Sequence, residues 1–146
     1  MALCLIPVLG GCGGSDSEGA TTESLSKAEF IKAADAICKK SDQIQGGELK
    51  AYVKANPKAE SSKAGQIKLV EAAGLPAVRT EIEELSELGT VRGSEAEADA
   101  LIKEMEKALG ESEDEPEKVL KASANPFASV EQRAAKFGFK ECNSPL

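Results

Sequence analysis

The strongest constraint on the fold is a helical spacing of apolar residues that recurs along most of the chain. In the segment after Ser94, apolar residues stand three and four positions apart and so share one face of an α-helix. They are Ala98, Leu101, Ile102, Met105 and Leu109. Similar spacing marks the segments 76–88 and 127–137. No stretch alternates apolar and polar residues with the period of a β-strand, so the sequence predicts an all-α fold.

Capping residues and glycines divide this part of the chain into helices. Two pairs have the spacing of a capping box and predict helix starts: Ser26 with Glu29, and Ser94 with Glu97. Glycines after the apolar stripes predict helix ends, at Gly46, Gly74, Gly89, Gly110 and Gly138. We therefore expect residues 26–146 to form a small bundle of about five to six helices around one modest core.

Composition excludes several classes of function. The chain has 146 residues with 18 Lys and Arg against 25 Asp and Glu, a net charge of −7. Nucleic-acid binding needs clustered positive charge, so we expect no nucleic-acid partner. The chain contains no His and no Trp. Catalytic triads and metal sites built on His are therefore excluded, and we expect no metal ion and no cofactor.

The first residues have the pattern of an export signal. Residues 1–9 read MALCLIPVL, an apolar run much shorter than the ~20 residues that span a bilayer, which predicts a signal peptide over residues 1–11. The following Leu9-Gly10-Gly11-Cys12 resembles the bacterial lipobox. On this resemblance, Cys12 becomes the first mature residue and its thiol accepts a diacylglyceryl group. The alternative is a Gly-rich flexible leader with an incidental cysteine.

The segment after Cys12 is predicted to be a tether. Residues 13–25 are almost entirely small or polar, and a random coil of this length spans about 20 Å. The domain assignment is therefore a signal peptide over 1–11, a lipidated Cys12 and flexible tether over 12–25, and a helical extracytoplasmic domain over 26–146. Membrane attachment would rest on the acyl chains, because a net charge of −7 is repelled by anionic headgroups.

Two cysteines remain in the predicted domain, Cys38 and Cys142. Outside the reducing cytosol such a pair favours a disulfide. A disulfide that closes a loop of about 100 residues stabilises the folded state by roughly 4.7 kcal/mol in the chain-entropy model. The alternative is two buried free thiols. Zinc ligation is disfavoured, because two cysteines without His fall short of a tetrahedral site.

Three short motifs resemble a group of small secreted or lipid-anchored actinobacterial proteins. The motifs are Ala33-Ala34-Asp35-Ala36-Ile37-Cys38, the Gly74-Leu75-Pro76 helix start, and Phe137-Gly138-Phe139-Lys140-Glu141-Cys142. The group shows an "ADAIC" first helix and a "YGxxxC" ending. The resemblance implies a helical extracytoplasmic domain with a Cys38–Cys142 disulfide, and it brings no catalytic residues.

Acidic residues and the single tyrosine are the remaining candidates for a site. Carboxylates for acid/base chemistry could come from Glu81, Glu83, Glu84 and Glu87. Glu83 and Glu87 share the face opposite Ile82 and Leu85, as an ordinary solvated surface does. The run Glu111–Glu115 lacks the pattern of a calcium loop, so we expect a solvated connection there. Tyr52 is expected in the core, with a groove as the alternative.

These observations favour a non-enzymatic lipoprotein of the cell envelope that binds a protein or small molecule. One alternative is a structural or inhibitory protein that covers a protein partner, which an exposed apolar patch would favour. An apolar pocket would favour a small ligand. The other alternative is an enzyme using carboxylates, Ser or Lys, which requires a buried carboxyl pair in a cleft.

Overall fold

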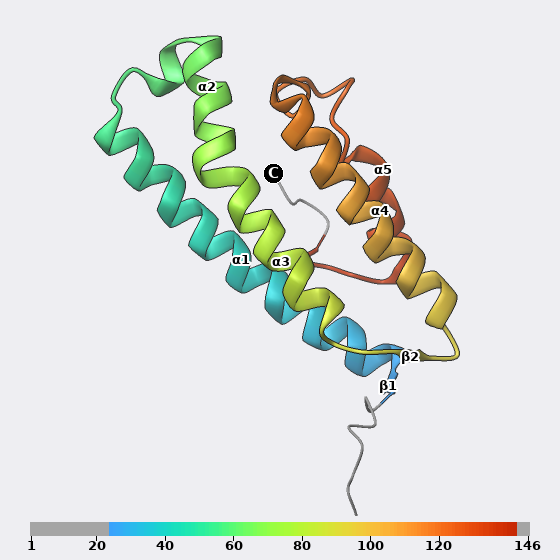
Figure 1. Cartoon of the computed structure of the whole chain (residues 1–146). Helices are drawn as coiled ribbons and strands as arrows, with labels where there is room; N and C mark the ends of the chain where they lie inside the picture. The colour runs from blue at the N-terminus through green and yellow to red at the C-terminus, as the bar shows by residue number, and fades with distance from the viewer. Residues whose placement is uncertain (1–23, 143–146) are drawn as a thin grey trace, which may run out of the picture.

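Helices lying side by side make up about three quarters of the described part of the chain, residues 24–142, in a computed structural model (Figure 1). The predicted signal peptide, Cys12 and most of the predicted tether lie outside these described residues. In chain order the elements are β1 (Leu25–Ser26), α1 (Lys27–Ala55), the 3₁₀ turn η1 (Ala59–Ser61), α2 (Lys63–Leu69), the π turn η2 (Val70–Gly74), α3 (Leu75–Ser86), β2 (Val91–Arg92), α4 (Glu95–Asp114), the 3₁₀ turn η3 (Pro116–Lys118) and α5 (Ala128–Phe137).

The helix count differs from the prediction, although the all-α class is confirmed. Because η2 joins α2 to α3 without a break, residues 24–142 contain four continuous helices rather than five to six. Gly46 and Gly47 lie inside α1, and Gly110 lies inside α4. A glycine ends a helix when it takes a positive φ, and these three do not. Gly138, with φ of 121°, does end α5 as predicted.

Of the two predicted capping boxes, only the first is present. The Glu29 amide donates to Ser26 Oγ at 3.3 Å, and the Ser26 amide donates to Glu29 Oε2 at 2.9 Å. The second box is wrong, because Ser94 has ψ of 25° rather than an extended backbone and its side chain caps no amide. Before α4, the Gly93 amide instead donates to Glu95 Oε1 at 3.0 Å.

The acidic run after Gly110 is helical, whereas the sequence predicts a solvated connection there. Glu111, Glu113 and Asp114 form the last turn of α4. Negative charge at a helix C-terminus is unfavourable, and nearby cations offset it. Arg79 pairs with Glu113, and Lys107 lies 3.4 Å from Glu111.

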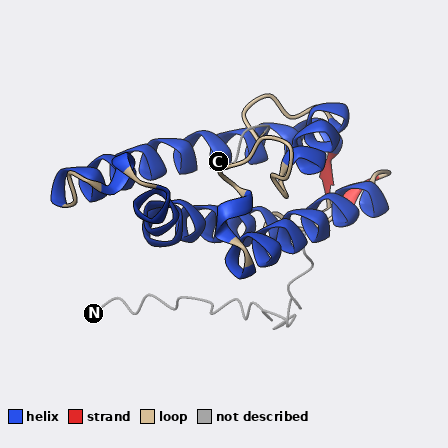
Figure 2. Ribbon diagram, turned by 90° about the horizontal axis from the view of Figure 1, so that it is seen from above, coloured by secondary structure: helices blue, strands red, loops and turns tan. Residues whose placement is uncertain are grey.

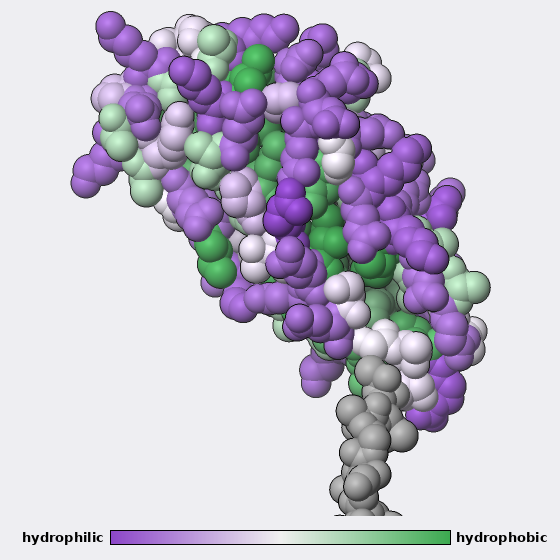
Figure 3. Space-filling model, viewed as in Figure 1, coloured by the Kyte–Doolittle hydropathy of each residue, from purple (hydrophilic) through white to green (hydrophobic). Residues whose placement is uncertain are grey.

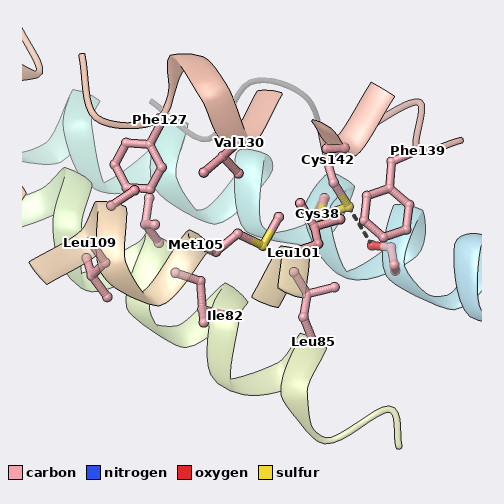
Figure 4. Close-up of a cluster of buried hydrophobic side chains, with 14 of the residues drawn as sticks. Cys38, Ile82, Leu85, Leu101, Met105, Leu109, Phe127, Val130, Phe139 and Cys142 are labelled. Atoms are coloured by element: carbon pink, nitrogen blue, oxygen red, sulfur yellow. Dashed lines mark hydrogen bonds between the residues drawn. A yellow bond between two sulfur atoms is a disulfide. The ribbon is translucent and has the colours of Figure 1, made fainter. Parts of the chain in front are cut away.

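The core lies where α1, α3, α4 and α5 meet (Figure 4). Three aromatic rings form one cluster, with the Phe30 and Phe137 centroids 6.0 Å apart and those of Phe137 and Phe139 5.2 Å apart. Next to it, a disulfide joins Cys38 of α1 to Cys142, with Cα atoms 5.1 Å apart. The structure thus contains the predicted bond rather than two free thiols. This bond ties the C-terminal segment to the first helix.

A short pair of strands fixes the chain just before α1 (Figure 2). Leu25 of β1 pairs in parallel with Val91 of β2, and the Leu25 amide donates to the Thr90 carbonyl at 2.9 Å. The sequence pattern places Leu25 in the tether and predicts no strand. Leu25 nevertheless packs against the core, and Val91 is fully buried.

Two regions of the molecule differ sharply in packing. We call residues 24–45 and 70–142 the disulfide-bonded half, and residues 46–69, at the opposite end of α1 from β1, the distal hairpin (Figure 1). In the distal hairpin only Ala59 is buried. Gly65 allows α2 to approach η1, because a Cβ there would lie 2.8 Å from Ala59 Cα.

Candidate functional site

A cleft between α1 and α3 contains a buried carboxyl group. Its volume is about 130 Å³. Several waters fit in such a space, but it is below the 300–1,000 Å³ typical of sites for drug-sized ligands. We call it the Glu81 cleft. It is lined by Lys40, Ser41, Ile44, Glu48, Pro76, Ala77, Thr80, Glu81 and Glu84.

Glu81 lies in the cleft with only 5% of its surface exposed. Ser41 of α1 makes a side-chain hydrogen bond to it across the helix pair. Burial is the main reason that the pKa of Glu81 is raised to about 7, and the Ser41 hydrogen bond opposes this shift. The negative charges of Asp42 and Glu84 add to it. Glu81 therefore exchanges a proton near neutral pH.

The rim of the cleft combines an ion pair with an apolar side chain. Lys40 Nζ lies 2.8 Å from Glu84 Oε1, so α1 and α3 are joined there. Ile44 is 48% exposed. With Glu84 paired, the carboxyl groups of Glu48 and Glu81 have no matching cation among the lining residues. The cleft thus offers negative charge beside apolar surface.

The cleft meets the requirement for carboxylate catalysis only in part. Glu81 is buried, whereas Asp42 is exposed. Burial, followed by the charge of Glu141, raises the pKa of Asp42 as well. The predicted requirement is a buried pair, and the cleft supplies one buried carboxyl. Its chemistry is that of a proton acceptor and of a binding partner for a cation.

A second recess lies between α3 and α4, where apolar surface shows between hydrophilic ridges (Figure 3). Its volume is about 230 Å³, and Ile82 and Leu109 contribute to it. Arg79 of α3 and Glu113 of α4 both line it and form an ion pair with each other. Glu83 and Glu106 also line it, and all four of these charged residues are exposed. The recess therefore contains no buried charged group, which makes it the weaker candidate.

Sequence patterns located some of these residues and missed the central one. Glu83 on α3 and Glu87 directly after it are exposed as predicted, and Glu84 is half-buried. The burial of Glu81 was missed, although it stands four positions after Ala77 and four before Leu85, on the buried stripe of α3. That spacing is the signal that could have found it.

The other predicted candidates lie apart from the Glu81 cleft. Tyr52 is half-buried in the distal hairpin and lines a groove there, so the expected core position is wrong. Cys12 lies outside the described residues. Within residues 24–142, no group of three or more His, Cys, Asp or Glu is placed to hold a metal ion. No helix in this range is long and apolar enough to cross a membrane.

The Glu81 cleft, the disulfide and the N-terminal motif are the features of the chain that bear on its function. The resemblance to actinobacterial lipoproteins stays a prediction. No protein-family model, no curated protein and no solved structure matches the chain.

Proposed function

We propose that the protein is a lipoprotein of the cell envelope, anchored through Cys12, whose helical domain is a non-enzymatic binding module. The observation that carries this proposal is the Cys38–Cys142 disulfide. Disulfides persist in oxidising compartments and are rare in the cytosol. The Leu9-Gly10-Gly11-Cys12 motif and the resemblance to actinobacterial lipoproteins support the same location.

In this arrangement the domain is held close to the membrane without entering it. Two acyl chains on Cys12 supply a stable anchor. The tether then reaches the domain at Leu25, which the pairing with Val91 fixes to the folded part. The acidic surface makes little contribution to membrane attachment, because a net charge of −7 is repelled by anionic headgroups.

The binding site in this proposal is the Glu81 cleft, and its ligand is a compact cationic group on an aliphatic stem. A primary ammonium group would donate hydrogen bonds to the Glu81 carboxylate. Ile44, Pro76 and Ala77 line the cleft and would contact the stem. The volume of about 130 Å³ suits the end of an alkylammonium chain. A small free amine and a lysine of a protein partner share this chemistry.

The anchoring is tested by the intact mass of the protein from its native membrane fraction, measured with and without reduction and alkylation. We expect a chain that begins at a diacylglyceryl-modified Cys12 and is alkylated at Cys38 and Cys142 only after reduction. The Cys12→Ser variant should leave the membrane fraction. An unprocessed chain with freely alkylated Cys38 and Cys142 would contradict the proposal.

The cleft is tested by titrating the full Cys12→Ser chain with n-butylammonium and, separately, with a lysine-containing peptide, and following backbone amide shifts by NMR. Glu81→Gln should weaken binding about tenfold, the usual cost of losing a charged hydrogen-bond partner. Glu83→Gln is the matched control, because Glu83 is exposed on the same helix. Binding of the peptide alone identifies a protein partner, and binding of both identifies the ammonium group itself.

The pH dependence separates this proposal from a general attraction to an acidic protein. Because the pKa of Glu81 is about 7, its carboxylate becomes available as pH rises through this value. Affinity should therefore be about tenfold higher at about pH 8 than at about pH 6, and Glu81→Gln should abolish the difference. Equal affinity at both pH values would rule out Glu81 as the binding group.

A further inference from the structure

The distal hairpin carries charge of the opposite sign to the rest of the protein. Residues 46–69 contain five lysines and two glutamates, a net charge of +3. The whole chain carries −7, so the remaining residues carry −10. The lysines are Lys50, Lys54, Lys58, Lys63 and Lys68. This end of the molecule therefore attracts anions although the protein as a whole repels them.

The five lysines are exposed, and no acidic group in residues 24–142 forms an ion pair with them. Six other cationic side chains do form such pairs: Lys27, Lys40, Arg79, Lys107, Lys118 and Arg133. Within the distal hairpin, the acidic residues are Glu48 and Glu60. The positive charge of this region is thus largely uncompensated within the described structure.

An open groove of about 570 Å³ lies at the junction of α1, η1 and α2, and two of the five lysines line it. Lys58 and Lys68 line it, together with Tyr52, the only tyrosine of the chain. Asn56 Nδ2 donates to the Tyr52 carbonyl, and Ser62 Oγ accepts from the Gly65 amide. The Asn56 side-chain oxygen and the Ser62 hydroxyl proton add hydrogen-bonding groups to the groove. The groove therefore combines positive charge, an aromatic ring and polar groups.

We propose that the distal hairpin binds a flexible polyanion, a polymer with repeated phosphate or carboxylate groups, along the Tyr52 groove. Repeated anionic groups would contact several lysines at once, and each contact would release counterions. The ring of Tyr52 would contact the backbone of the polymer between its charged groups. This surface is separate from the Glu81 cleft and does not depend on a ligand there.

A polymer fits this surface better than an anionic membrane does. Binding at a membrane surface is strengthened by apolar side chains that enter the headgroup region. In residues 24–142 the exposed large apolar side chains are Ile44 and Leu120, and both lie outside the distal hairpin. A groove with lysines on its walls also suits a chain-like ligand. The hairpin lies at the far end of α1 from β1, where the predicted tether ends (Figure 1).

The test uses the full Cys12→Ser chain, so that no acyl chain contributes, with long-chain polyphosphate and poly-L-glutamate as probes. The chain has one tyrosine and no tryptophan, so its intrinsic fluorescence reports on the groove. We expect both probes to change the Tyr52 fluorescence. If about four lysines are engaged, log Kd should rise with log salt concentration with a slope of about 3, taking the value for single-stranded nucleic acids.

Two triple variants with the same net charge locate the surface. Lys54→Gln, Lys58→Gln and Lys68→Gln together should raise Kd about tenfold or more, since each lost contact removes part of the counterion release. The control neutralises three exposed lysines of the disulfide-bonded half and should change Kd less than about twofold. The control residues are Lys103, Lys121 and Lys136. Circular dichroism melts confirm that both variants are folded.

Three results would overturn the inference. Equal weakening by the two triple variants would mean that only net charge matters. Polymer binding without a change in Tyr52 fluorescence would place the contact outside the groove. Binding to vesicles rich in phosphatidylglycerol, without binding to either polymer, would assign the lysines to a lipid surface.

Discussion

The disulfide-bonded half and the distal hairpin belong to one chain and share α1, yet different interactions hold them together. In the first, α1, α3, α4 and α5 bury a core with an aromatic cluster and a disulfide. In the distal hairpin, Ala59 is the only buried residue, and the part of α1 that belongs to it begins with Gly46 and Gly47. Regions with few buried contacts open locally at low free energy. The disulfide-bonded half is therefore expected to be stable, and the distal hairpin to open more easily.

Loss of the disulfide should have the largest effect. The bond closes a loop with a sequence separation of 104, so the Cys38→Ser/Cys142→Ser variant should lose up to about 4–5 kcal/mol of unfolding free energy. Denaturant unfolding under non-reducing conditions measures this loss. If the two regions open separately, amide exchange in residues 46–69 should change little at the same time. A parallel rise in exchange there would show that the hairpin depends on the same core.

Truncating one leucine in each region should give clearly unequal results. Leu101 is 1% exposed in the core, and Leu101→Ala should cost about 2–5 kcal/mol. Leu49 is half-buried in the distal hairpin, and Leu49→Ala should cost about 1 kcal/mol or less. Thermal and urea unfolding measure both variants. Similar losses would mean that the hairpin is as well packed as the core.

Replacing Glu81 should stabilise the disulfide-bonded half in a pH-dependent way. The pKa of Glu81 rises from 4.5 to about 7 on folding. Its stabilising contribution is therefore complete below pH 4.5 and is lost as pH rises to about 7. At about pH 8, Glu81→Gln should gain about 2–3 kcal/mol over the wild type. This variant leaves unchanged the other groups that face Glu81 or line its cleft. They are Lys40, Ser41, Asp42, Glu48 and Glu84.

The matched control for this pH effect is Glu60→Gln in the distal hairpin. Glu60 is exposed, so its replacement removes one negative charge without removing a buried group. Melting temperatures between about pH 4 and pH 8 compare the two variants. A profile for Glu81→Gln that follows the wild type would show that the carboxyl is not the source of the pH dependence.

Two glycine replacements give the smallest effects and the sharpest comparison. A Cβ at Gly46 or at Gly110 meets no atom within 4 Å, so alanine should favour either helix by about 1 kcal/mol. If the hairpin opens on its own, Gly46→Ala should slow amide exchange within residues 46–69 and leave global unfolding almost unchanged. Gly110→Ala should raise the global unfolding free energy. Equal global gains would show that the chain unfolds as one unit.

The sequence predicted the helical class and much of the core because apolar periodicity records which face of a helix is buried. Leu101, Met105 and Leu109 on α4 are the clearest case. Helix ends were harder to predict, because a glycine permits a positive φ without requiring one. Gly138 adopts that conformation, whereas Gly46, Gly74 and Gly110 were predicted as helix ends and instead continue their helices. The helix count was wrong for this reason.

The candidate sites were only partly predictable. Glu81 is acidic, so composition places it on the surface, and only its register with Ala77 and Leu85 indicates burial. Its partner Ser41 lies 40 positions earlier on another helix, and pairing across that distance requires the fold. The charge of the distal hairpin was hidden for another reason. A net charge of −7 for the whole chain conceals a local +3 that only the separation of the two regions reveals.

The length of α1 has a mechanical consequence. One continuous helix of 29 residues, about 43 Å long, runs from the entry of the chain at Ser26 to Ala55 in the distal hairpin. A force applied between these two ends therefore travels along the hydrogen bonds of one helix and does not pull the other helices off the core. Cys38 ties the same helix covalently to the bundle part-way along its length. The bundle therefore limits bending of α1, and α1 transmits a force applied between its two ends.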